Sequence, residues 1–369
     1  MRMTQLKTIA DIQTGPFGSQ LHKEDYVETG TPIVTVEHLG NRVFTEQNLP
    51  RVSDSDKARL IKYTLSTGDI VFSRVGSVDR CSYVDKSHDG WMFSGRCLRV
   101  RPTEPVDSLY LYYYFCLEET KQFVRNIAVG ATMPSINTKL LGEVEIALPD
   151  LNNQKRIAAV LSSLDDKIEN NQKLNDNLQQ QAQAIYSSMF IDNPDPAWSH
   201  GHLSDLITVK YGKDHKKLAD GIYPVYGSGG IMRYVERPLY NKESVLIPRK
   251  GTLNNVMYVN QPFWSVDTMF YTEMKLPNVA KFVYHFVKAK DLASMNAGSA
   301  VPSMTTDVLN AMEVVIPSAS ALEEFESLVA PMYEAMEAND VQSKALSQMR
   351  DTLLPKLMSG AIDVSDVQL

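Results

Sequence analysis

The sequence lacks any run of eighteen or more apolar residues, the length that a membrane-spanning helix requires. Its first residues, Met1 to Ile9, also lack the apolar core of a secretion signal. Cysteine is scarce, and Cys81, Cys97 and Cys116 show no spacing typical of a metal site. We therefore expect reduced thiols in a cytoplasmic protein that does not contact a membrane.

Enzyme motifs are also missing. The segment Asn193–Pro196 lacks the second proline and the aromatic residue of an amino-methyltransferase motif, and no phosphate-binding loop occurs. The glycines of Tyr226–Gly230 are better explained as a turn than as a cofactor loop, because no acidic residue follows at the usual distance. Asp165 and Lys167 resemble part of a nuclease pattern, but they fall on a predicted helix. The seven histidines show no ligand spacing. We expect no catalytic residues, no metal site and no cofactor in this chain.

The net charge of −7 argues at first against a nucleic-acid partner, but the charge is unevenly distributed. Residues 203–260 contain nine basic and five acidic residues, whereas residues 319–369 contain three basic and nine acidic ones. A surface that faces phosphates needs local positive potential rather than a basic total. Ordinary scatter of charge remains the alternative explanation.

The chain contains an internal duplication. Residues 69–84 match residues 244–259 at an offset of 175, and residues 130–141 match residues 298–309 at an offset of 168. The second offset continues without a gap to the end of the chain. Such self-similarity indicates two copies of one unit, each with a globular part followed by a long helix.

The two long helices are predicted from apolar residues that recur every seven positions. Residues 152–190 contain neither proline nor glycine, and their apolar stripe is typical of a coiled coil. Because the offset of 168 is a multiple of seven, Asn171 and Asn339 occupy the same position of the pattern, where a polar residue disfavours wrong registers. The alternative is two independent surface helices. The expected helix-pairing residues are Ile157, Leu161, Leu164, Ile168, Asn171, Leu178, Ile185, Phe325, Val329, Met332, Asn339, Leu346 and Leu353.

A helix of 39 residues is about 58 Å long. It could therefore hold two globular parts apart over one to two turns of duplex DNA. The globular parts mix short β-rich runs, such as Thr31–Val36 and Val245–Pro248, with helical segments. In the helical segment Leu109–Arg125, the aromatic residues are expected in a core rather than as a platform for stacked bases. The proline-rich stretch Asn193–Trp198 marks a domain boundary.

The order of these features resembles the specificity subunits of Type I restriction–modification enzymes. The most specific match is Asn153–Phe190, and the ending Leu353–Val364 is also typical. The resemblance implies an α+β fold with two pseudo-symmetric mixed α/β target-recognition domains, separated by two long antiparallel coiled-coil helices. The second helix departs from the family pattern in being acidic and in placing Arg350 among its pairing residues.

On this basis we divide the chain into four segments. Residues 1–150 and 192–317 are the expected target-recognition domains, residues 151–191 the first long helix, and residues 318–369 the second long helix with a C-terminal tail. The resemblance implies that each domain reads one half of a bipartite site in double-stranded DNA. It also implies that the helices set the spacer and dock two methyltransferase subunits, which use S-adenosylmethionine. Cleavage would require two motor–nuclease subunits that use ATP and Mg²⁺.

Candidate DNA contacts come from basic residues near expected strand ends. Arg74 and Arg249 occupy matched positions of the repeat, where an arginine could reach a phosphate or a guanine edge, or else pair with a local carboxylate. Arg80 and Arg96 are further candidates in the first domain. The candidates for phosphate contact in the second domain are Lys210, Lys213, Lys216, Lys217 and Lys250.

Two other functions remain open on the sequence alone. One is an interaction scaffold whose coiled coil binds protein and whose globular parts bind no DNA. The other is an enzyme with a diverged active site, which the missing motifs disfavour.

Overall fold

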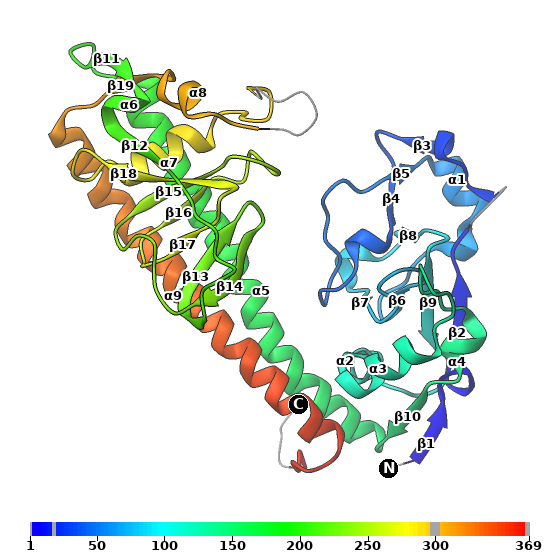
Figure 1. The fold of residues 1–369 in the computed structure, drawn as a ribbon. Helices are drawn as coiled ribbons and strands as arrows, with labels where there is room; N and C mark the ends of the chain where they lie inside the picture. The colour runs from blue at the N-terminus through cyan, green and yellow to red at the C-terminus, as the bar shows by residue number, and fades with distance from the viewer. Residues whose placement is uncertain (1, 17–19, 296–302, 366–369) are drawn as a thin grey trace. The chain divides into compact units, whose positions relative to one another are not determined.

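The computed structural model describes residues 2–16, 20–295 and 303–365 (Figure 1). By its internal contacts the chain forms two compact units. Unit 1 contains Met1–Asn170 and Val341–Leu369, and unit 2 contains Asn171–Asp340. Part of the second repeat motif (298–302) and the end of the predicted C-terminal tail (366–369) lie outside the described residues. Within the described part of the chain, no helix is long and apolar enough to cross a membrane.

Unit 1 is built around an antiparallel sheet of four strands in the order β2-β9-β6-β7. A second sheet has the order β3-β5-β4-β8, and β1 pairs with β10. The strands are β1 (Arg2–Gln5), β2 (Ala10–Thr14), β3 (Tyr26–Val27), β4 (Thr31–Val34), β5 (Arg51–Val52), β6 (Ile70–Ser73), β7 (Cys81–Tyr83), β8 (Met92–Phe93), β9 (Cys97–Pro102) and β10 (Glu145–Leu148).

Helices and short 3-10 turns connect the strands of unit 1. The segment Leu109–Arg125 forms two helices rather than one, and its tyrosines at 110, 112 and 113 are buried in the core as predicted. Asp107 caps the first of them by accepting a hydrogen bond from the Tyr110 backbone N–H. The helices are α1 (Asp54–Arg59), α2 (Ser108–Cys116), α3 (Glu118–Ile127) and α4 (Thr138–Gly142), and the 3-10 turns are Leu6–Thr8, Lys23–Asp25, Val36–His38, Ile61–Tyr63 and Lys86–His88.

Unit 2 repeats the four-stranded antiparallel sheet and the separate two-stranded pair of unit 1, but its remaining sheet has one strand fewer. Its four-stranded antiparallel sheet has the order β12-β18-β15-β16, β11 pairs with β19, and a third sheet has the order β14-β13-β17. The strands are β11 (Ser199–His202), β12 (Ile207–Tyr211), β13 (Asp220–Gly227), β14 (Gly230–Val235), β15 (Ser244–Pro248), β16 (Met257–Val259), β17 (Trp264–Ser265), β18 (Met269–Met274) and β19 (Glu313–Ile316). The helices are α6 (Leu203–Leu206), α7 (Ala280–Lys288) and α8 (Thr306–Asn310).

Strand register shows how closely the two units correspond. In unit 1, Val34 of β4 pairs in parallel with Phe93 of β8, and in unit 2 Tyr226 of β13 pairs in parallel with Ser265 of β17. The central strands β6 and β15 are buried at every position, which explains why both read as short apolar runs. The mixed α/β fold and the predicted internal duplication are confirmed.

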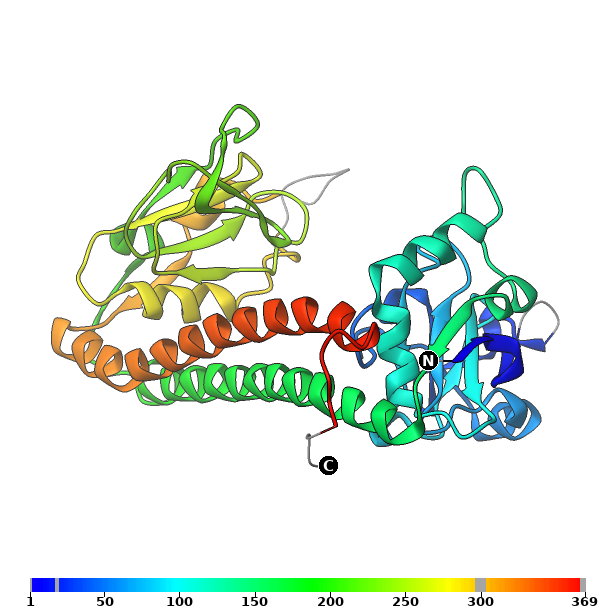
Figure 2. The same ribbon diagram turned by 90° about the horizontal axis from the view of Figure 1, so that it is seen from below.

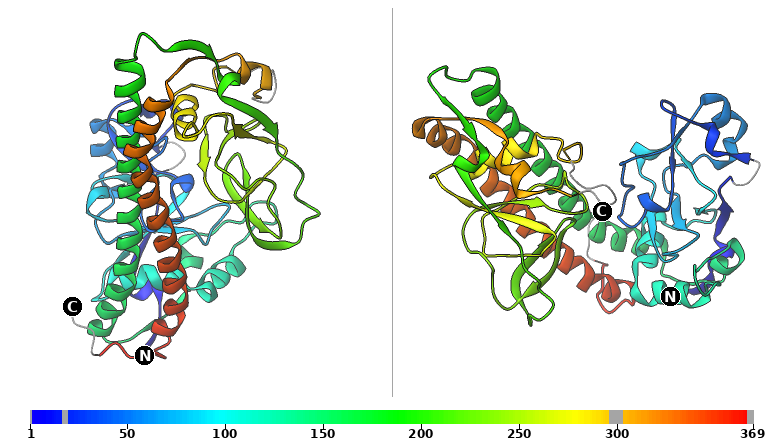
Figure 3. Two further views of the ribbon diagram at one scale, coloured as in Figure 1. Left: turned by 90° about the vertical axis from the view of Figure 1, so that its left-hand side faces the viewer. Right: turned by 45° about the horizontal axis from the view of Figure 1, so that its top comes forward.

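Two long helices contribute to both units: α5 (Leu151–Ser187), which continues as a π-helical turn over Ser188–Asp192, and α9 (Ala319–Met358). They pack side by side and antiparallel in each unit (Figures 2 and 3). Gly360 follows α9 with φ +75, the left-handed conformation that commonly ends a helix.

Each residue expected in the helix-pairing stripe is buried or half-buried. Several also pack into the core of the adjoining sheets: Ile157 and Leu161 join the core of unit 1, and Phe325 and Val329 join that of unit 2. In unit 2, Asn171 Nδ2 donates to the backbone oxygen of Asn339 at 3.3 Å, so the two matched asparagines meet. Helix residues outside this stripe, such as Ala158, Tyr186 and Tyr333, are also buried, which the seven-residue pattern alone did not predict.

Candidate nucleic-acid interface

Arg74 lies directly after β6, in the loop that leads to β7. Its backbone N–H donates to the oxygen of Arg96 at 2.8 Å, and its Nη1 donates to the oxygen of Gly95 at 3.2 Å. The structure therefore brings Arg74 and Arg96 together from two loops. Gly76, two residues on, has φ +76, a conformation that glycine adopts without strain.

Arg80 and Arg96 are both exposed. Among the residues that the structure describes, none forms a hydrogen bond or an ion pair with either guanidinium. Arg80 ends the loop that Arg74 begins, because it directly precedes β7. Both side chains are thus available to an anionic ligand in unit 1.

Arg249 occupies the equivalent place in unit 2, directly after β15. Its backbone N–H donates to the oxygen of Thr268 at 2.9 Å and its Nη1 to the oxygen of Asp267 at 3.0 Å. The guanidinium carbon also lies 5.5 Å from the centre of the Tyr211 ring, within range of a cation–π contact. Arg74 and Arg249, which occupy matched positions of the repeat, therefore have the same local geometry in the two units.

The carbonyl oxygens of the two arginines confirm this correspondence. Ile136 donates its N–H to the oxygen of Arg74, and Met304 donates its N–H to the oxygen of Arg249, both at 2.9 Å. Ile136 and Met304 are 168 positions apart, the offset of the second repeat. The arginine loop of each unit is therefore tied to the segment that follows the same repeated motif.

Strand ends bring several of the predicted lysines of unit 2 near Arg249. Lys213 follows β12 and Lys250 follows Arg249, and both side chains are exposed. The ends of β12 and β15 flank the start of β18, because Tyr211 and Ile247 both pair with Phe270. Lys213 and Lys250 therefore belong to one end of this sheet.

The remaining lysines differ in their surroundings. Lys216 and Lys217 are exposed in the loop after Lys213, where the backbone N–H of Lys216 donates to Asp214 and helps to lower the pKa of that carboxyl. Lys210 lies on β12 and forms an ion pair with Glu273 at 3.6 Å. Lys210 is the least available of the predicted phosphate contacts, because a carboxylate already neutralises it.

A glycine directly follows β2 in unit 1 and β12 in unit 2, and the repeats in the sequence did not reveal this match. A Cβ on Gly15 would lie 2.2 Å from the oxygen of Ser94, and one on Gly212 would lie 2.0 Å from the oxygen of Val266. Only glycine allows the two backbones to approach so closely. The two glycines are 197 positions apart, an offset that neither repeat shares.

The sequence also did not predict a short hairpin between Val129 and Ser135, which lies beside the loop of Arg74. Val129 and Ser135 exchange backbone hydrogen bonds, and the Gly76 N–H donates to the oxygen of Pro134 at 2.8 Å. At its tip, Met133 is 64% exposed. The hairpin therefore presents an apolar tip next to the arginine loop.

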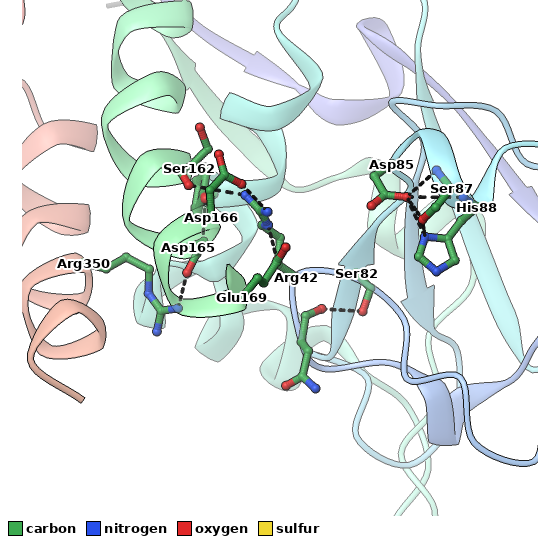
Figure 4. Close-up of polar contacts among 12 residues, drawn as sticks. Arg42, Ser82, Asp85, Ser87, His88, Ser162, Asp165, Asp166, Glu169 and Arg350 are labelled. Carbon is green, nitrogen blue, oxygen red and sulfur yellow. Dashed lines mark hydrogen bonds and ion pairs between the residues drawn. The ribbon is translucent and has the colours of Figure 1, made fainter. Parts of the chain in front are cut away.

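Polar side chains also join the long helices to each other and to the rest of each unit. In unit 1, Asp165 of α5 makes two of these contacts. Arg350 Nη1 lies 2.6 Å from Asp165 Oδ1 (Figure 4). The Tyr113 hydroxyl donates to Asp165 Oδ2 at 2.7 Å. Burial alone would lower the pKa of Arg350, but its hydrogen bonds with Asp165 and Asp351 outweigh burial and raise it. Arg350 thus fits the helix pair, because a carboxylate faces it.

Arg42 anchors a loop of unit 1 to the same helix. Its Nε donates to Glu169 Oε1 at 2.8 Å and its Nη2 to Asp166 Oδ1 at 2.5 Å (Figure 4). The loop before β5 is therefore fixed directly to α5. This contact joins residues more than 120 positions apart in the sequence.

In unit 2 a buried histidine contacts both long helices. His285 Nδ1 lies 2.7 Å from Gln183 Oε1, and its Nε2 lies 3.0 Å from the hydroxyl of Tyr333. Burial lowers the pKa of His285 to about 4. The imidazole is therefore neutral at pH 7, with Nδ1 as the donor and Nε2 as the acceptor.

Within the described ranges, no group of three or more His, Cys, Asp or Glu side chains is arranged to hold a metal ion. The geometry consists instead of two copies of an arginine loop on matching sheets, with an antiparallel pair of helices packed against each sheet. It defines a protein with two similar, internally repeated α/β units.

The chain belongs to the family described as Type I restriction modification DNA specificity domain, whose model matches residues 1–180 and 197–324. It is 27% identical over 310 residues to the Type I restriction enzyme MjaIX specificity subunit of Methanocaldococcus jannaschii, covering 72% of each chain. It is 21% identical over 416 residues to the HindI specificity subunit of Haemophilus influenzae, covering 82% of this chain and 88% of that one.

A solved structure shows the same fold. The crystal structure of a Type-I restriction-modification system S subunit from M. genitalium matches with a TM-score of 0.60 at 20% identity. The match covers 96% of this chain and 95% of that one. The predicted family and fold class are thus confirmed.

Proposed function

We propose that this chain is a non-catalytic subunit that supplies DNA sequence specificity to a Type I restriction–modification complex. Each unit reads one half of a bipartite duplex target, and the paired helices set the spacer between the half-sites. The observation that carries the proposal is the repeated arginine loop, with Arg74 and Arg249 held by equivalent backbone contacts.

The chemistry of these loops suits base reading. Backbone carbonyls hold one side of each guanidinium, which reduces the side-chain entropy that binding would otherwise cost. An arginine fixed in this way can donate to O6 and N7 of guanine in the major groove. The exposed Arg80 of unit 1 and Lys213, Lys216, Lys217 and Lys250 of unit 2 would contact phosphates, which position the protein without specifying sequence.

The catalytic steps belong to partner subunits in this proposal. Two methyltransferase subunits, which use S-adenosylmethionine, dock on the paired helices. Where the system also cleaves, two motor–nuclease subunits supply ATP hydrolysis with Mg²⁺. The absence of methyltransferase and phosphate-loop motifs in the sequence supports this division of labour.

Methylation mapping of the chain in complex with its methyltransferase tests the proposal. The wild-type complex should modify one bipartite site, and Arg249→Ala should reduce base discrimination in only one half-site, by roughly 10- to 100-fold. Arg74→Ala should affect only the other half-site. Lys242→Ala, an exposed charge change in the same unit, is the matched control and should leave both half-sites unchanged.

The same complex distinguishes the scaffold alternative. Duplex binding should weaken steeply as salt rises, because phosphate contacts release counterions. A wild-type complex with no salt-dependent duplex binding and no preferred site would contradict the proposal and favour a protein-binding scaffold.

A further inference from the structure

A concavity of about 500 Å³ lies beside the arginine loop of unit 1. The wall residues that matter here are Tyr26, Thr35, Glu37, Ser94, Gly95 and Arg96. Gly95 is the residue whose backbone oxygen accepts the hydrogen bond of Arg74. The concavity therefore adjoins the place where the proposed function puts DNA.

The wall that carries Glu37 is held in place by His38, which is 1% exposed. The Thr35 backbone N–H donates to His38 Nδ1 at 3.0 Å, so Nε2 carries the proton and donates to the oxygen of Gln47 at 3.0 Å. The Thr35 hydroxyl then donates to Glu37 Oε1 at 3.0 Å. One carboxylate oxygen is thus held by the turn, and Glu37 itself is exposed.

The part of the wall that carries Ser94 and Arg96 is also fixed by hydrogen bonds. The Ser94 N–H donates to the oxygen of Val34 at 2.8 Å, and the Arg96 N–H donates to the Ser94 hydroxyl at 3.4 Å. Although Glu37 and Arg96 line the same concavity, no ion pair joins them or links either to another described residue. The concavity therefore presents a free acceptor and a free donor together.

This pair of groups complements the major-groove edge of one kind of base pair. Cytosine offers the N4 amino donor, which a glutamate accepts, and guanine offers O6 and N7, which an arginine contacts with two donors. An A·T pair fits less well, because the planar fork of arginine matches the two acceptors of guanine best.

We propose that Glu37 and Arg96 read one G·C base pair in the half-site that unit 1 recognises. This inference rests on the proposed function and adds to it the identity of one base pair. Aligning the parallel strand pairs of the two units places Gly229 and Thr268 of unit 2 at the positions of Glu37 and Arg96. The reading of this G·C pair is therefore confined to one half-site.

The test is methylation sequencing of a randomised target library with the chain bound to its methyltransferase. Glu37→Gln and Arg96→Ala should each reduce the preference for G·C by roughly 10- to 100-fold, and both should do so at the same single position. Glu104→Gln removes an exposed carboxylate elsewhere in unit 1 and should leave every position unchanged.

Other outcomes would overturn the inference in distinguishable ways. If the two variants alter different positions, or none, Glu37 and Arg96 do not read one base pair. If Arg96→Ala lowers methylation equally on all sequences, Arg96 contacts a phosphate. In both cases a wild-type complex that still selects a bipartite site leaves the proposed function standing, whereas a wild-type complex with no site preference overturns both.

Discussion

Replacing Arg350 with alanine is expected to lower the free energy of unfolding by about 3 kcal/mol, the lower end of the range for breaking a buried ion pair. The Asp165 side chain is only 7% exposed, whereas that of Arg350 is 29% exposed, which places the effect at that lower end. Without the guanidinium, the buried carboxylate would retain the hydroxyl of Tyr113 but lose its opposite charge. Equilibrium unfolding in urea measures the change.

A double variant separates the ion pair from simple loss of packing. Adding Asp165→Asn to Arg350→Ala should recover much of the lost stability, because the amide oxygen can still accept from the Tyr113 hydroxyl while no buried charge is left unpaired. Lys356→Ala, an exposed change on the same helix, should alter stability by less than about 0.5 kcal/mol. An Arg350→Ala protein as stable as wild type would show that the pair does not stabilise unit 1.

Acidification is expected to destabilise the protein through His285, by up to about 3 kcal/mol between pH 6.5 and pH 4. The pKa of this histidine is lowered from 6.5 to about 4 in the fold, because its side chain is buried. The unfolded chain therefore takes up a proton in this pH range while the folded chain does not. Stability is complete above pH 6.5 and falls as the pH approaches 4.

The unfolding free energy of wild type and of His285→Gln should be compared across this pH range. The glutamine variant should lose the part of the pH dependence that His285 contributes, whereas His22→Gln, at an exposed site, should keep it. Identical pH profiles for wild type and His285→Gln would contradict the assignment of a neutral, buried imidazole.

Repetition in the sequence predicts much of this fold. A constant offset links two segments only where no residue is inserted between matched positions, and this holds along the helices and around each arginine loop. The match of Arg74 with Arg249 could therefore be found by spacing alone. The positive φ of the matched Gly76 and Gly251 shows that both copies of the loop need a glycine at this turn.

Contacts between distant segments could not be predicted in the same way. Arg350 and Asp165 are 185 positions apart, and the seven-residue pattern places Arg350 among the pairing residues without identifying the carboxylate that faces it. Gly15 and Gly212 escaped detection because loops of different length change the offset between the repeats. Glu37 was not predicted because a single exposed carboxylate has no sequence signal until the fold places it in the same concavity as Arg96.

The proposed function requires that the paired helices fix the distance between the two half-sites. Inserting one heptad after Asn170 of α5 and another after Asp340 of α9 should preserve the pairing pattern and lengthen both helices by about 10 Å. Methylation mapping of this variant should find the same half-sites with a gap longer by about three base pairs, since each base pair spans about 3.4 Å. A gap of unchanged length in the active variant would show that the helices do not set the spacer.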